Sequence, residues 1–352
     1  MDRSRYFDHA ATTPVDAFVR EAMMPFLGDD CGNAHSLHQW GLRAREAVEG
    51  ARQAVARLLG AEDPSEVVFT SGATESNNTV LAAFDSVAVS PFEHSSVREP
   101  ALSRGAWIMS NEGWTLSPPS PVELVSVMTV NNETGALLTM PECPGAMRHT
   151  DATQAVGKLA FDATAYDFVS CSGHKFYGPK GVGALFLRGA EPIEPLLRGG
   201  GQEHGVRAGT LNVPGIVGMG MAAELAHERR IHDFDHAVAL RGALFAGIEP
   251  VPDCFVFSPE HASPYIVSLA FAGVQGESLV IELDRLGFAI SSGAACSSGS
   301  TEPSPVLTAL GLSEDLVRGA IRISFGRENT LESVESLAKN LAEAVLALRT
   351  LG

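Results

Sequence analysis

Short apolar runs alternate with helical stretches along most of this chain. Residues 66–69, 125–130, 168–171 and 184–187 have the composition of buried strands, and the apolar spacing over residues 42–59 predicts a helix with one buried stripe. Strands and helices that alternate in this way predict an α/β architecture with a mainly parallel sheet. Residues 114–121, which contain three prolines, read as a loop.

The length of 352 residues predicts one large domain and a smaller one. Residues 215–247 are rich in Ala, Leu and Glu and predict a helix long enough to bridge two domains. Beyond it the order changes to a strand at 266–271, a helix at 277–286, a strand at 321–325 and a closing helix at 331–348. We therefore expect a large domain at 14–249, with residues 1–13 and 250–352 forming a small domain.

Composition excludes several functional classes and indicates where the protein is located. The 25 Lys and Arg against 42 Asp and Glu give a formal charge of −17, which argues against a protein that grips nucleic acid through its phosphates. The five cysteines form no Cys-x-x-Cys pair, so neither a disulfide framework nor a metal site is indicated. The N-terminus shows no secretory segment and no apolar run reaches the length of a membrane helix. These features predict a soluble, cytoplasmic protein without a membrane partner.

Residues 172–175 read Ser-Gly-His-Lys and lie between a predicted buried strand and a turn rich in glycine. A lysine is rarely buried without a partner. Lys175 is therefore either paired or a desolvated amine suited to Schiff-base chemistry, with an ordinary surface lysine as the alternative.

Two polar motifs follow predicted strands. Residues 70–74, Thr-Ser-Gly-Ala-Thr, meet the start of a predicted helix, where free backbone N–H groups could bind an anion; a plain helix cap is the alternative. Asp151 lies at a predicted strand end, where ligands bind in such sheets. Its carboxylate could keep a pyridinium nitrogen protonated, or it could only close an Asx turn.

Three further side chains are candidates for chemistry. His94 could stack on an aromatic cofactor or act as an acid or base. Cys296 lies in a run of small and polar residues, 291–300, which is the setting of a reactive thiol. Arg322, in a predicted strand, could bind a substrate carboxylate or make a structural ion pair.

Taken together, these motifs resemble those of the NifS/IscS cysteine desulfurases, in the class V, fold type I family that depends on pyridoxal 5'-phosphate (PLP). The resemblance covers nearly the whole chain and implies the fold type I transferase architecture, a large domain with a seven-stranded, mainly parallel sheet and a smaller α+β domain. The matching segments follow in family order at residues 7–14, 69–77, 93–94, 130–133, 151–154, 172–175, 207–210 and 292–296.

The resemblance also implies a role for each matching residue. Lys175 would bind PLP covalently and later move a proton, His94 would stack on its ring, and Cys296 would take the substrate sulfur as a persulfide. The remaining contacts would come from Asp151 to the ring nitrogen, from Gln154 and Asn132 to the phenolic oxygen, from Ala73, Thr74, Ser172, His174 and the partner subunit's Thr210 to the phosphate, and from Arg322 and Asn33 to the substrate carboxylate.

The implied partners are L-cysteine, a second copy of the chain in a homodimer, and a sulfur acceptor such as an iron–sulfur scaffold or a sulfur-relay protein. Sulfur would then serve iron–sulfur cluster assembly or thio-modification. A selenocysteine lyase or a cysteine C–S lyase on the same fold is the alternative among enzymes. A non-catalytic subunit with the PLP fold is the alternative of another class, and the presence of both Lys175 and Cys296 argues against it.

Overall fold

A computed structural model describes residues 2–190, 193–293 and 303–351 of the chain. Its largest sheet has seven strands in the order β1-β9-β8-β7-β6-β2-β3. In that sheet β9 runs antiparallel to both neighbours, and the other adjacent pairs are parallel. These strands are β1 (Val67–Thr70), β2 (Val87–Val89), β3 (Trp107–Ile108), β6 (Leu124–Ser126), β7 (Met147–Asp151), β8 (Phe168–Ser172) and β9 (Gly183–Leu187).

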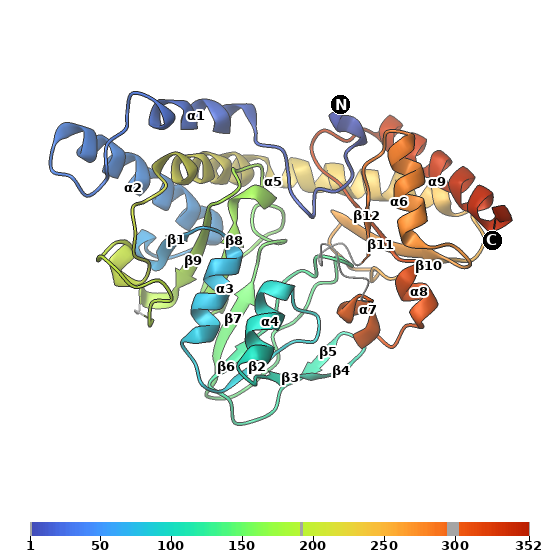
Figure 1. Ribbon diagram of the computed structural model, residues 1–352, viewed down its shortest axis with the longest axis horizontal. Coiled ribbons are helices and arrows are strands. Elements are labelled where there is room, and N and C mark those ends of the chain that lie inside the picture. The colour runs from blue at the N-terminus through green and yellow to red at the C-terminus, as the bar shows by residue number, and fades with distance from the viewer. Residues whose placement is uncertain (1, 191–192, 294–302, 352) are drawn as a thin grey trace.

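Helices cover both faces of this sheet (Figure 1). On one face, α1 (Ala17–Leu27), α2 (Gln39–Leu59) and the long α5 (Val213–Ile248) share a core with Val67 and Phe69 of β1. On the other face, α3 (Ala73–Ala82) and α4 (Ser95–Ser103) pack with Val68. Adjacent strand residues thus point to opposite faces, both buried, which explains the continuous apolar runs of these strands.

A second, antiparallel sheet of four strands has the order β10-β11-β13-β12. Its core includes Phe7 from the N-terminal segment and Leu244 from the far end of α5, which extends from one sheet to the other (Figure 1). This part of the chain contains β10 (Cys254–Val256), β11 (Ile266–Phe271), β12 (Ser291–Ser292), β13 (Ile321–Ser324), α6 (Gly276–Arg285), α7 (Pro305–Ala309), α8 (Glu314–Arg318) and α9 (Leu331–Leu351).

The predicted α/β architecture is confirmed, and two local predictions are wrong. The strand expected over residues 125–130 ends at Ser126, because the chain turns to give the Met128 N–H to the buried carboxylate of Glu93. The expected loop at 114–121 contains β5 (Thr115–Ser117), which pairs with β4 (Ser110–Glu112). Gly113, at a φ of 57°, makes the tight turn between them. The domain boundaries remain a prediction.

Gly72 and Gly183 allow α3 to lie close to the large sheet where β1 and β8 end. β1 and β8 both end where β9 begins, and Gly183 pairs with Thr70 on one side and Ser172 on the other. A Cβ atom on Gly183 would lie only 2.6 Å from the Gly72 Cα atom and 2.6 Å from the Cys171 carbonyl oxygen. Since real Cβ contacts are not that short, a side chain at Gly183 would push α3 away from the sheet.

Substitution Gly183→Ala should therefore lower the free energy of unfolding by roughly 1–3 kcal/mol, the usual cost of overpacking a dense site. Gly50→Ala is a matched control because Gly50 lies inside α2 with no atom within 4 Å of its added Cβ. That change should stabilise the chain by about 0.5–1 kcal/mol through helix propensity. Urea denaturation measures both, and an undiminished midpoint for Gly183→Ala would contradict the close-approach argument.

Candidate active site

A cavity of about 520 Å³ opens at the carboxyl edge of the large sheet, where β1, β7 and β8 end. Ligands of open α/β sheets bind at this edge. Nine of the residues singled out from the sequence line it, namely Ala73, Thr74, His94, Asn132, Asp151, Gln154, Ser172, His174 and Lys175. Residues that are far apart in the sequence are therefore gathered around one space.

Lys175 projects into this cavity from the short 3-10 helix Gly173–Lys175 that follows β8. Its Nζ atom donates hydrogen bonds to the carbonyl oxygens of Ala10, at 2.6 Å, and Ala11, at 2.7 Å. Both acceptors are neutral. An amine held in this way beside a cavity is suited to covalent capture of an aldehyde.

The N-terminus of α3 borders the cavity and is a candidate anion-binding site. Its N-cap residue is Gly72, which has no side chain to accept from the first backbone N–H groups of the helix. Those groups and the helix dipole favour a bound anion such as a phosphate. His174 beside them is neutral, because burial first and the charges of Lys175 and Lys180 next lower its pKa to about 3. Its Nδ1 atom lies 3.1 Å from the hydroxyl of Thr12.

A buried hydrogen-bond chain joins Asp151 to His94. One carboxylate oxygen of Asp151 accepts from the amide of Asn77 at 2.8 Å, and the same amide nitrogen donates to the Ser96 hydroxyl at 2.9 Å. That hydroxyl lies 2.8 Å from Nδ1 of His94. Since the Ser96 backbone N–H also donates to Nδ1, the ring proton is assigned to Nε2.

Asn77 was missed as a site residue by the sequence analysis. It lies four residues after Ala73 on α3, so both occupy one face of the helix. That spacing from the 70–74 motif, on one face of the helix, is the signal that could have found it.

Three predicted residues do not line this cavity. Thr210 and Asn33 are exposed, and the Asn33 side chain accepts from the His35 backbone instead. Arg322 is buried beside the cavity: it donates to the Asn132 carbonyl at 2.9 Å and pairs with the Asp8 carboxylate at 2.8 Å. The ion-pair alternative for Arg322 is therefore present in this structure. Cys296 lies outside the residues that the structure describes.

Two buried carboxyl groups, those of Glu93 and Glu133, lie near the site. Burial raises the pKa of Glu93 to about 8, although its Oε1 atom accepts from the Met128 N–H at 2.7 Å. Burial also raises the pKa of Glu133 to about 7, against the lowering effects of its hydrogen bond from Ser304 and of the charge on Arg322. Protonated Glu93 limits the negative charge near Asp151.

Among the described residues, no cluster of three or more His, Cys, Asp or Glu side chains could hold a metal ion. No helix in the described ranges is both long and apolar enough to cross a membrane.

Comparison with known proteins identifies the family. The family model described as aminotransferase class-V matches residues 5–337. A cysteine desulfurase IscS of Anaeromyxobacter dehalogenans is 42% identical, with 98% of this chain and 93% of that protein covered. The chain belongs to the cysteine desulfurase group of the class V aminotransferases. Cysteine desulfurase NifS of Azotobacter vinelandii, another member, is 39% identical over the same shares of the two chains.

Two solved structures share the fold. A NifS-like protein matches with a TM-score of 0.88 and 34% identity, covering 97% of this chain and 99% of that one. SspA, solved in complex with cysteine, matches with a TM-score of 0.79 and 31% identity, covering 93% of this chain and all of that one, 100%. The family uses PLP, and a cavity with an amine, a carboxylate and a helix N-terminus fits that cofactor.

The raised pKa of buried Glu93 leads to a prediction about how stability depends on pH. The pKa of Glu93 rises from 4.5 to about 8 on folding, so unfolding releases a proton between those values. The contribution of Glu93 to stability therefore falls as the pH rises through that window and is constant above it. Thermal melting of Glu93→Gln should show a shallower decline from pH 5 to 8 than the native protein. Glu99→Gln, on the exposed surface of α4, is the control and should follow the native profile; equally steep profiles for all three proteins would refute the assignment.

Proposed function

We propose that this chain is a PLP-dependent enzyme that removes sulfur from L-cysteine, releases L-alanine and leaves the sulfur on Cys296 as a persulfide. The observation that carries the proposal is the meeting of the Lys175 amine, the Asp151 carboxylate and the α3 N-terminus in one cavity. This geometry occurs in a chain that is 42% identical to a protein named cysteine desulfurase.

The lining residues would hold the cofactor as the family resemblance implies. Lys175 would bind it covalently, Asp151 would contact its ring nitrogen, and His94 would lie against its ring. Its phosphate and phenolic oxygen would be held by Ala73, Thr74, Ser172 and His174 and by Asn132 and Gln154, respectively. When bound, PLP withdraws electrons from the substrate α-carbon.

The chemistry of the chain's own residues follows from that arrangement. Lys175 carries the proton that leaves the substrate α-carbon, and His94, whose proton is on Nε2, can donate to a leaving group. The Cys296 thiolate attacks the substrate sulfur. A sulfur–sulfur bond forms, the carbon–sulfur bond breaks, and its electron pair stays on carbon, which gains a proton as alanine leaves.

The active unit in this proposal is a cytoplasmic homodimer. Thr210 is exposed and away from the cavity of its own subunit, so it is free to complete the phosphate site of the partner. Sedimentation velocity on the active protein measures the assembly directly. The persulfide would pass to an acceptor protein of iron–sulfur cluster assembly or thio-modification.

Cys296→Ser tests the sulfur-carrying role. The variant should bind PLP and change its visible spectrum on addition of L-cysteine, because those steps need Lys175 and the cofactor alone. Alanine formation, followed by amino-acid analysis, should be lost. Cys31→Ser, at an exposed cysteine, is the matched control and should keep full turnover. Alanine production by Cys296→Ser at the native rate would instead indicate one of the other lyases.

Arg322→Ala tests the carboxylate anchor. A bidentate arginine–carboxylate contact contributes on the order of 2–3 kcal/mol, so KM for cysteine should rise by roughly tens to hundreds of times at about 1.4 kcal/mol per factor of ten. Asp8→Asn is the control, since it removes the ion pair seen at Arg322 and keeps the arginine. If both variants lose the same melting temperature and neither changes KM, Arg322 serves only the ion pair with Asp8.

A further inference from the structure

A second lysine, Lys158, is buried behind the active-site cavity. Only 6% of the residue is exposed, and its Nζ atom lies 5.8 Å from the centre of the Tyr265 ring. Burial, followed by the charges of Lys175 and Arg322, lowers the pKa of Lys158 to about 7. Burying an amine costs desolvation free energy unless a hydrogen-bond partner replaces the water that it loses.

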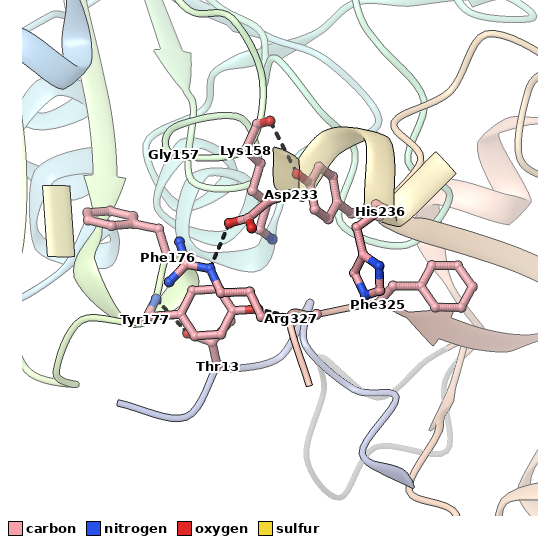
Figure 2. Close-up of a pocket in the computed structure, with 12 residues that line it drawn as sticks. Thr13, Gly157, Lys158, Phe176, Tyr177, Asp233, His236, Phe325 and Arg327 are labelled. Carbon is pink, nitrogen blue, oxygen red and sulfur yellow. Dashed lines mark hydrogen bonds and ion pairs between the residues drawn. The ribbon is translucent and has the colours of Figure 1, made fainter. Parts of the chain in front are cut away.

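Asp233, the acid that lines the same small cavity as Lys158, forms its ion pair with another residue. Figure 2 shows Lys158 beside a cavity of about 20 Å³ together with Asp233 of α5 and Arg327 of the segment after β13. The Asp233 carboxylate binds Arg327 at 2.6 Å, and the Arg327 guanidinium lies 4.0 Å from the centre of the Tyr177 ring. Within the described ranges, no carboxylate oxygen lies within 4.0 Å of the Lys158 amine.

The polar partner of Lys158 is Gln154, which lines the active-site cavity. The Lys158 amine donates to Oε1 of Gln154 at 2.9 Å. At the other side of the amide, Nε2 donates to the Ala10 carbonyl oxygen at 2.9 Å, and this oxygen also accepts from Lys175 at 2.6 Å. A carbonyl oxygen only accepts, so the two contacts define which end of the amide is which.

We propose that Lys158 is a positioning residue that fixes the amide of Gln154 with its NH₂ group, and not its oxygen, toward the phenolic oxygen of PLP. The inference rests on the cofactor role proposed for Gln154. One N–H of the amide donates to Ala10 and the other is left for the cofactor. A reversed amide would set two acceptor oxygens against each other, and Lys158 prevents this because it donates to the oxygen end.

Lys158→Met removes the donor and the charge at nearly the same length. Full-length protein is dialysed against graded PLP concentrations, and bound PLP is read from its absorption band. The variant should bind PLP about tenfold more weakly, which is the loss of roughly one hydrogen bond. Its melting temperature in the absence of PLP should be unchanged or higher, because the desolvation cost of a buried amine without a carboxylate partner has been removed. Lys158→Arg, which keeps donor N–H groups, should bind PLP more tightly than Lys158→Met.

A double-mutant cycle shows whether Lys158 acts through Gln154. In the Gln154→Leu background, Lys158→Met should cause no further loss of PLP affinity. A full tenfold loss in that background would overturn the inference, and so would native PLP affinity with a lowered melting temperature. Borohydride reduction of the native protein, with the adduct mapped to Lys175, is checked first. Absence of that adduct would overturn the proposed function. If the adduct forms but the double-mutant cycle shows no coupling, only the role of Lys158 is overturned.

Discussion

The hydrogen bonds of residues 10–13 link the two sheets, and this segment lines one side of the active-site cavity. This segment leaves the small sheet, where Asp8 bridges to Ser324 of β13, and crosses to the large sheet. There the Ala10 carbonyl oxygen accepts from Lys175 and Gln154, and the Thr13 N–H donates to the His174 carbonyl at 2.9 Å. The same few backbone groups therefore orient the candidate cofactor lysine and hold the end of β8.

Charge in this site is balanced by burial more than by ion pairs. Lys158 on one side and Glu93 and Glu133 on the other are each pushed toward their neutral forms. Asp151 is instead held by donors, the Asn77 amide and the Thr153 backbone N–H. These two neutral donors orient the Asp151 carboxylate at the end of β7.

Much of the site could be predicted because its residues follow strands. Thr70, Asp151 and Ser172 are the last residues of β1, β7 and β8, and parallel strands bring their carboxyl ends to one edge. Asn77 and Lys158 could not be assigned in the same way. Helix spacing places Asn77 on the same face as Ala73 but does not identify Asp151 as its partner, and the spacing of Lys158 from Gln154 does not show which end of the amide it contacts.

The sequence by itself determined the alternation of strands and helices, the order of the motifs and the family to which they point, because periodicity and short motifs are local properties. Only the tertiary structure decided the partners of buried polar groups. It placed Arg322 against Asp8, Lys175 against the Ala10 carbonyl and Lys158 against Gln154. These contacts join residues far apart in the chain or set the direction of an amide, and both are settled when desolvated groups must find hydrogen-bond partners on packing.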